Sequence, residues 1–266
     1  MSIENLFINV ADVQTSVEFY EEFLGAQVIG EVTADHALLD FVSATFELVR
    51  LDEAEPSTWQ GDDLHKGFRH IGFKVPHVDA LVAKLKAADV PFHLDPLDAE
   101  GGVRISFFFD PDGTLLELVE GDLQYHQIAN EAGVLAERAL GIPARPRFDH
   151  VAVTVDDLSA TEGYYSPLGF VRIGTINQAH DSRGFEINFL KSDDTVLEIF
   201  TYTAPKQDRV PQLNALGFVA ARFTFASTPF VPPVGSVVGE SADGEPVFAD
   251  ADGFTFSLAK GQNDGE

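Results

Sequence analysis

The sequence predicts an α+β fold built from four copies of a strand–helix–three-strand unit. Three observations support this: a short apolar segment with a central acid recurs, each recurrence ends a stretch that opened on an apolar strand, and an amphipathic helix follows three of the four opening strands. The recurring segments are Phe-Glu-Leu-Val at 46–49, Leu-Glu-Leu-Val at 116–119, Leu-Glu-Ile-Phe at 197–200 and, without the acid, Phe-Ser-Leu-Ala at 256–259. Internal repetition specifies the architecture of a chain. We therefore treat the sequence as four βαβββ modules, numbered 1 to 4.

The opening strands are predicted at 6–10, 70–75, 150–155 and 220–225. In the first three, alternation places apolar side chains on one face, as for Leu6, Ile8 and Val10. The opposite faces are polar or small and include His70 and His150. Each strand therefore needs a cover on its apolar face and can line a cleft with the other.

The covering elements are predicted to be helices in modules 1 to 3. In module 1, Asp12 is suited to cap a helix that runs to Gly25, with apolar residues at helical spacing between them. The same spacing recurs over 78–85 and 158–169. In module 4, Pro229, Pro232 and Pro233 interrupt the corresponding stretch, so a loop or short turn is expected there.

Three strand-like runs complete each module, for example 26–32, 37–42 and 45–51 in module 1. Asp-Pro-Asp-Gly at 110–113 and Asp-Ala-Asp-Gly at 250–253 predict hairpin turns before the last strands of modules 2 and 4. Alternation in the last strands puts Glu47, Glu117 and Glu198 on the face away from the Leu and Ile side chains. These acids can therefore share a concave surface with the polar face of the opening strands.

Length and composition restrict the class of protein. The chain has 266 residues, enough for two domains, which we expect at 1–121 and 147–262 with a linker helix in 122–146. There are 17 Lys and Arg against 43 Asp and Glu, a net charge of −26 that argues against binding nucleic acid or an anionic membrane. The N-terminus carries no signal-peptide pattern, so a cytoplasmic protein is expected. Cysteine is absent, so any metal must use nitrogen and oxygen ligands.

These features resemble the vicinal oxygen chelate superfamily, which includes glyoxalase I, extradiol dioxygenases and bleomycin-resistance proteins. The matching marks are Val-Ala-Asp at 10–12, Gly-Phe-Arg-His-Ile at 67–71, and the turn at 110–113 that leads to Leu-Glu-Leu at 116–118. The resemblance implies that modules pair into two domains, each an eight-stranded U-shaped mixed sheet around a cleft with helices outside. It also implies metal ligands on the first and last strand of each module. With modules 1 and 2 paired, and 3 and 4 paired, the first cleft would offer Asn5, Glu47, His70 and Glu117, and the second His150, Glu198, Ala220 and Ser257.

The favoured hypothesis is one divalent ion (Fe, Mn, Co, Ni or Zn) held by His70, Glu47 and Glu117, with Asn5 as a further oxygen ligand. The reaction expected from the resemblance is proton transfer on a small carbonyl compound, of isomerase or lyase type, through a metal-stabilised enediolate. Glu47 or Glu117 would act as the base. On this hypothesis His70→Ala loses the ion, which would otherwise dissociate between roughly pH 5 and 6.

Other residues are assigned lesser roles. His150 and Glu198 would form a partial second site, and His150→Ala would leave the ion in place. Arg104 could pair with a substrate carboxylate or phosphate, and Phe7 could form an apolar wall of the cleft. The partners expected are a small-molecule substrate and, at most, a second copy of the chain.

Two alternatives remain at this point. One is a non-haem iron dioxygenase, which Asn5 disfavours because the usual iron triad needs a second imidazole. The other is a metal-free protein that sequesters an aromatic antibiotic, which the weaker match of module 4 keeps open.

Overall fold

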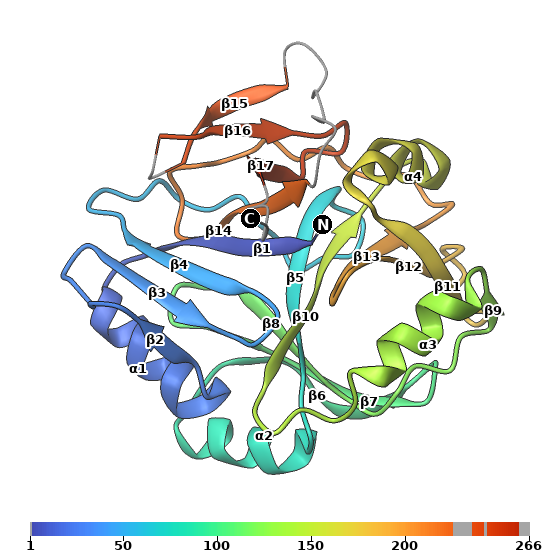
Figure 1. The fold of residues 1–266 in the computed structure, drawn as a ribbon, viewed down its shortest axis with the longest axis horizontal. Helices are drawn as coiled ribbons and strands as arrows, with labels where there is room; N and C mark the ends of the chain where they lie inside the picture. The colour runs from blue at the N-terminus through green and yellow to red at the C-terminus, as the bar shows by residue number, and fades with distance from the viewer. Residues whose placement is uncertain (1, 226–235, 242–243, 261–266) are drawn as a thin grey trace, which may run out of the picture.

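The computed structural model describes residues 2–225, 236–241 and 244–260 and contains the four expected modules (Figure 1). The elements of modules 1 and 2 are β1 (Ile3–Val10), α1 (Val13–Leu24), β2 (Gln27–Ile29), β3 (His36–Asp40), β4 (Thr45–Arg50), β5 (Gly67–Lys74), α2 (Val78–Ala87), β6 (Phe92–Ala99), β7 (Val103–Phe109) and β8 (Leu115–Glu120). A short strand and a helix follow in the stretch expected to be a linker, namely β9 (Gln127–Ile128) and α3 (Glu131–Ala139). Those of modules 3 and 4 are β10 (Arg147–Thr154), α4 (Leu158–Tyr165), η1 (Ser166–Leu168), β11 (Val171–Asn177), β12 (Glu186–Ser192), β13 (Thr195–Thr201), β14 (Gly217–Phe225), β15 (Val237–Glu240), β16 (Pro246–Ala249) and β17 (Thr255–Lys260).

The strands form two mixed sheets, and the sheets join modules in an unexpected order. One has eight strands in the order β15-β16-β17-β14-β1-β4-β3-β2, and the other has nine in the order β6-β7-β8-β5-β10-β13-β12-β11-β9. The first therefore combines modules 1 and 4, through antiparallel β1 and β14, and the second combines modules 2 and 3, through antiparallel β5 and β10. Figure 1 shows the β5–β10 pair crossing the centre of the molecule. The prediction that each sheet is made of modules adjacent in sequence is wrong.

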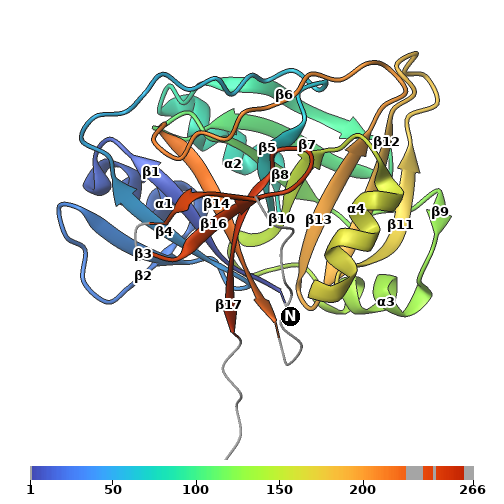
Figure 2. The same cartoon turned by 90° about the horizontal axis from the view of Figure 1, so that it is seen from above.

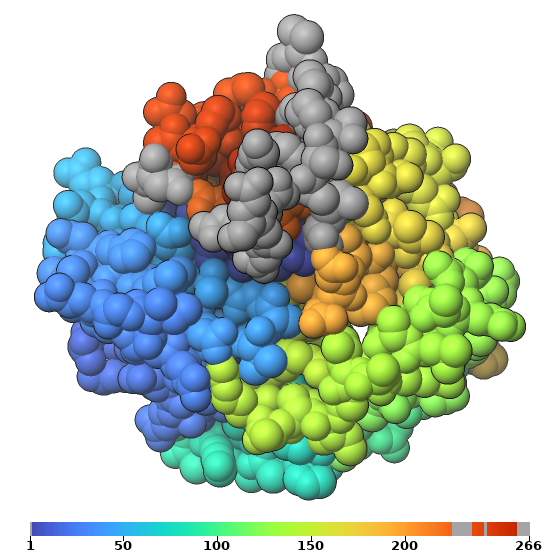
Figure 3. Space-filling model, viewed as in Figure 1, coloured from blue at the N-terminus to red at the C-terminus, as the bar shows by residue number. Residues whose placement is uncertain are grey.

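Modules adjacent in sequence instead pack against each other through their apolar faces. The rings of Phe46 in module 1 and Phe73 in module 2 lie 5.6 Å apart, within one large apolar cluster that also includes residues of modules 3 and 4. Tyr20 of α1 donates a hydrogen bond of 2.7 Å to Asp110 in the turn of module 2. The edges of β1 and β5 that do not pair with β4 and β8 pair with β14 and β10 in the other half of the chain. The space-filling view shows the blue first module next to the red fourth (Figure 3).

Helix α1 begins and ends where the sequence predicts, whereas α4 begins at the predicted residue but ends at Tyr165 and is followed by the 3-10 turn η1. The carboxylate of Asp12 accepts from the backbone N–H of Thr15, and Gly25 ends α1 with a φ of 61°, in the left-handed region. Asp157 caps α4 in the same way through the N–H of Ala160. The interruption expected at Pro229, Pro232 and Pro233 lies outside the described residues. Within the described ranges, no helix combines the length and apolar character needed to cross a lipid bilayer.

Candidate metal centre

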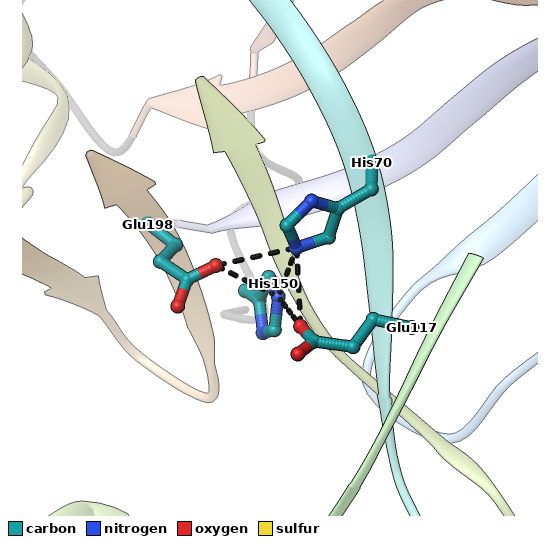
Figure 4. Close-up of side chains that lie close together, drawn as sticks. All are labelled: His70, Glu117, His150 and Glu198. Atoms are coloured by element: carbon teal, nitrogen blue, oxygen red, sulfur yellow. Dashed lines mark hydrogen bonds and ion pairs between the residues drawn. The ribbon is translucent and has the colours of Figure 1, made fainter. Parts of the chain in front are cut away.

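Four polar side chains converge at the centre of the nine-stranded sheet. They are His70 on β5, Glu117 on β8, His150 on β10 and Glu198 on β13, and one ligand atom of each lies within 4.8 Å of all the others. Figure 4 shows the Nε2 atoms and the carboxylates pointing toward one another from four strands. His150 Nε2 lies 3.0 Å from Glu117 Oε2 and 3.2 Å from Glu198 Oε2. His70 Nε2 lies 3.1 Å and 3.3 Å from the same two oxygens.

The strand register explains this convergence. His150 pairs with Gly72 and His70 pairs with Ala152 across the β5–β10 seam. Gly72 lies beside Glu117 in the parallel pair with β8, and Ala152 lies beside Glu198 in the parallel pair with β13. Each imidazole therefore faces a small residue and is close to the carboxylates of both modules.

Gly72 is required for this approach. A Cβ atom at position 72 would lie 2.0 Å from Cε1 of His150, which is closer than any real contact. An alanine there would therefore displace the His150 ring from the cluster. Ala152, the small residue that pairs with His70 across the same seam, is fully buried.

The four residues fit a divalent cation. They are 1% to 7% exposed and supply two imidazole nitrogens and two carboxylates. Two ligand atoms at right angles around an ion, each about 2.1 Å from it, are separated by about 3 Å, close to the distances found here. The Glu198 Oε2 atom is buried and accepts no hydrogen bond from the described residues. Two carboxylates buried without a cation would be costly, so the donor set favours an ion with mixed nitrogen and oxygen ligands.

The charges in the cluster are strongly coupled. Burial opposes ionisation of Glu198, but His150 and His70 more than offset burial and hold the pKa of Glu198 well below its usual range. Burial likewise opposes protonation of His150, yet Glu198 and the hydrogen bond to Asp149 raise the pKa of His150 well above 6.5. The site therefore attracts positive charge, and a bound cation would take the place of the His150 proton.

Asp149 holds the far side of the His150 ring. Its Oδ2 lies 3.1 Å from His150 Nδ1, whereas Nδ1 of His70 is buried without a hydrogen-bond partner. A carboxylate on one ring nitrogen fixes the tautomer that leaves the other nitrogen free to bind a metal. The two imidazoles are therefore held differently, and His150 is the better oriented.

We expect Asp149→Asn to weaken metal binding by roughly 10- to 100-fold, the usual cost of losing a hydrogen-bond partner of a ligand. Asn can keep the ring in place but supplies no negative charge. Metal affinity would be measured by competition with a chelating dye. Glu100→Gln is the control, since this acid lines the neighbouring pocket without contacting either imidazole. Equal affinities of wild type and Asp149→Asn would show that Asp149 does not orient His150.

Asn5 and Glu47 do not belong to this cluster, so the predicted grouping of both residues with His70 is corrected. They lie on β1 and β4 of the other sheet, where Asn5 Nδ2 donates to Glu47 Oε2 at 2.9 Å. The other oxygen of Glu47 is 3.2 Å from His36 Nε2. The remaining positions of that sheet hold Ala220 and Ser257, so this second cleft has a single carboxylate. The degenerate cleft is therefore the one shared by modules 1 and 4.

His150 and Glu198 are likewise not a separate secondary site. They meet His70 and Glu117 in one cluster, because modules 2 and 3 share a sheet. The predicted metal-binding domain at 1–121 holds half of this cluster, and the region at 147–262 holds the other half. The polar residues that open modules 2 and 3 were a usable signal, since only these two modules begin with His and end with Glu.

The two residues predicted to contact substrate are engaged elsewhere. Arg104 pairs with Asp79 at 2.7 Å and Asp98 at 2.9 Å near the outer edge of the sheet. Phe7 is 2% exposed, and the guanidinium of Arg222 lies 4.5 Å from its ring centroid. Arg104 is thus part of a structural ion-pair group, and Phe7 belongs to the core beside the degenerate cleft.

A pocket of about 190 Å³ opens beside the cluster. Both carboxylates, Glu117 and Glu198, line it, and most of its other walls are aliphatic or aromatic: Val103, Ile105, Phe107, Leu123, Ile176, Phe185, Ile187, Phe189 and Phe200. The cation in its lining, Arg69, is already paired with Asp63 at 2.7 Å and lies over the ring of Phe200 at 4.1 Å. The pocket is therefore small, largely apolar and closed at one end by acids.

Known proteins share parts of this sequence and the whole of this fold. The chain is 32% identical over 126 residues to the uncharacterized protein YwkD of Bacillus subtilis, an alignment that covers 45% of this chain and 96% of the relative. It is 26% identical over 148 residues to a lactoylglutathione lyase of Pseudomonas putida, covering 42% and 81%. The structure of glyoxalase I from Zea mays superposes with a TM-score of 0.66 at 17% identity, covering 97% of this chain and 92% of that one.

The fold of all four modules is therefore the one found in the maize enzyme. The alignments with the Bacillus and Pseudomonas relatives cover 45% and 42% of this chain, which corresponds to about two of its four modules. A family model matches residues 2–118 and 147–258, which together span both halves. The chain belongs to the Glyoxalase/Bleomycin resistance protein/Dioxygenase superfamily.

Proposed function

We propose that the protein is a metal-dependent, glyoxalase-like enzyme that transfers a proton on a small carbonyl compound, as an isomerase or lyase. The observation that carries this proposal is the buried set of two imidazoles and two carboxylates at the end of an apolar pocket. The Pseudomonas relative named a lactoylglutathione lyase supports the same reaction class.

A bound divalent ion would polarise the carbonyl and stabilise the negative charge that develops when the neighbouring carbon loses a proton. The chain's own contribution is the proton transfer. Glu117 and Glu198 line the pocket, whereas neither imidazole is part of its walls. One of these two carboxylates is therefore positioned to take the proton from a substrate and return it to the adjacent carbon. Glu47, the other candidate from the sequence, lies in the other sheet.

For the dioxygenase hypothesis, His150 supplies the second imidazole that Asn5 could not, but the second carboxylate argues against it. An iron oxygenase triad uses two His and one carboxylate, which leaves positions for both the substrate and oxygen. Here a second carboxylate, Glu198, has an oxygen 3.3 Å from His70 Nε2 and 3.2 Å from His150 Nε2, so it would also bind the ion. Four protein ligands leave fewer open positions, which suits a substrate with two vicinal oxygens and no co-substrate.

The pocket favours an uncharged, apolar substrate. Among the described residues that line it there is no unpaired cation, since Arg69 is neutralised by Asp63, and the whole chain carries a net charge of −26. An anionic glutathione adduct, the substrate type named for the Pseudomonas relative, would find little to pair with there. We propose a small α-hydroxyketone, or the hydrate of an α-ketoaldehyde, with an apolar side chain.

The test is deuterium uptake from heavy water at the carbon next to the carbonyl, followed by NMR with the metal-loaded protein. An apolar α-hydroxyketone should exchange, and a glutathione hemithioacetal should exchange more slowly. At a metal concentration high enough to fill the weakened site, Glu117→Gln or Glu198→Gln should lower exchange by about 100-fold or more, the usual contribution of a general base. Glu47→Gln should not change it. No exchange with any metal, or equal exchange in both Gln variants and wild type, would refute the proposal.

A further inference from the structure

A second pocket lies between two long loops, away from the candidate metal centre. Residues 51–66 and 202–216 run side by side across the molecule, joined by the bridges Glu55–Ala215 and His65–Gln207 (Figure 2). The backbone N–H of Thr58 donates to Gln212 Oε1 at 2.7 Å. The loops and the first residues of β5 and β14 enclose about 320 Å³, a volume at the lower end of small-molecule sites. This pocket and the one beside Glu117 and Glu198 share no lining residue.

The walls of this loop pocket are aromatic. Phe68 of β5 and Phe218 of β14 stack with ring centroids 4.0 Å apart and planes 11° apart. Trp59 meets Phe109 edge to face at 6.1 Å on the other side. Because β5 and β14 belong to different sheets, a molecule bound here would contact both halves of the chain.

Arg209 is the one cation in the lining, and it has no carboxylate partner among the described residues. Its Nε donates to the carbonyl of Lys66 at 2.8 Å, so the two terminal nitrogens of the guanidinium remain available to a ligand. Burial lowers the pKa of Arg209 to about 10, with Asp62 opposing that effect. The acids nearby are already engaged: Asp208 pairs with Lys66 at 2.7 Å, and Asp112 accepts from Ala11 and Ser16.

Trp59 contributes a further aromatic wall, not a donor. Its Nε1 is buried and has no hydrogen-bond partner in the described chain. The benzene edge of the ring is turned toward Gly61, where its Cη2 lies 3.5 Å from the position of an added Cβ. The ring itself is part of the wall of the loop pocket.

We propose that the loop pocket binds a compact organic monocarboxylate with an aromatic or alicyclic body. The carboxylate would pair with the free edge of Arg209, and the body would lie against Trp59, Phe68, Phe109 and Phe218. A planar guanidinium matches a carboxylate with two parallel hydrogen bonds. A single positive charge in a chain of net charge −26 suits a monoanion rather than a phosphate dianion.

The chain contains one tryptophan, so fluorescence reports on this site directly. Benzoate is titrated into full-length protein in the presence of a metal chelator, which excludes binding through an ion. A saturable change in tryptophan emission is expected, with acetate and benzamide each binding at least about tenfold more weakly because each lacks one half of the recognised structure. Arg209→Gln should weaken benzoate binding by about ten- to hundredfold, the equivalent of one charged hydrogen-bonded pair. Arg104→Gln, which removes an arginine already paired with Asp79, should not.

Trp59→Ala removes an aromatic wall of the loop pocket, and calorimetry then replaces fluorescence as the readout. It should weaken benzoate binding severalfold with the fold preserved. Absence of saturation up to the solubility limit would overturn the proposal, as would equal binding by wild type and Arg209→Gln. So would benzamide binding as well as benzoate, since the pocket would then be a neutral aromatic site. Deuterium exchange at the metal centre is a separate measurement, and either result can fail without the other.

Discussion

His150→Ala should lose the divalent ion as completely as His70→Ala. Both imidazoles place Nε2 within 3.3 Å of the same two carboxylate oxygens, so neither residue is peripheral to the cluster. Removing a direct ligand should cost at least the 100-fold that marks the upper end for losing a ligand's hydrogen-bond partner. After dialysis against a weak chelator, elemental analysis should find about one ion per chain in wild type and close to none in either variant.

His36→Ala is the matched control. His36 also contacts a carboxylate, Glu47, at 3.2 Å, but that pair lies in the other sheet. Metal content should be unchanged in this variant. If His150→Ala retains the ion while Glu47→Gln loses it, the site is the one that sequence order alone suggested and the assignment made from the structure fails. Circular dichroism of each variant separates ligand loss from unfolding.

Local order was readable from the sequence because it depends on neighbouring residues. Asp12 and Gly25 delimit α1, and the alternation that placed Glu117 and Glu198 on the polar face of their strands agrees with their position in the cleft. The recurrence of similar segments identified four modules, and the structure contains all four. The family and fold expected from these marks are confirmed.

Module pairing was not readable in the same way. The apolar faces of β1 and β5 are alike, and either strand could in principle pair with β10 or β14, because strand edges carry only backbone groups. The choice depends on face-to-face packing within each half, as between Phe46 and Phe73, which alternation does not report. The site residues followed this error: Glu47 was grouped with His70 because it was near in sequence.

A better signal was present in the residues around the two histidines. Gly72 and Ala152 are the small residues two positions after His70 and His150, and the structure shows that they make room for the opposite imidazole. Module 1 has no small residue at the equivalent position, because Phe7 follows Asn5 by two positions. Reading the His-x-small pattern together with the final Glu would have pointed to modules 2 and 3.

The second large effect is expected at Asp110, where a buried acid links modules 1 and 2. Its Oδ2 accepts from the hydroxyl of Tyr20 at 2.7 Å, and its Oδ1 accepts from the backbone of Asp112 and Thr114. Burial raises the pKa of Asp110 to about 6, and the charge of Asp112 adds to this, against the hydrogen bond from Tyr20. The folded protein therefore binds a proton between about pH 4 and 6 that the unfolded chain has released, so stability from this group falls as pH rises through that range.

Asp110→Asn should remove this dependence. Asn keeps an acceptor for the two backbone N–H groups, and the Tyr20 hydroxyl can turn to accept from its amide. The free energy of unfolding of the variant, relative to wild type, should therefore rise by about 2 kcal/mol between pH 4 and 7. Urea unfolding with a chelator present gives both values at each pH.

Asp79→Asn tests the sign of the effect. The hydrogen bond from Arg104 lowers the pKa of Asp79, so the stability that this acid contributes is present above its unfolded pKa and is lost as pH falls. The difference between Asp79→Asn and wild type should therefore run in the opposite direction and below about pH 4, becoming less favourable to the variant as pH rises toward the unfolded pKa of Asp79. If the difference between Asp110→Asn and wild type stays constant from pH 4 to 7, Asp110 titrates like an exposed acid, and the proton shared with Tyr20 does not stabilise the contact between modules 1 and 2.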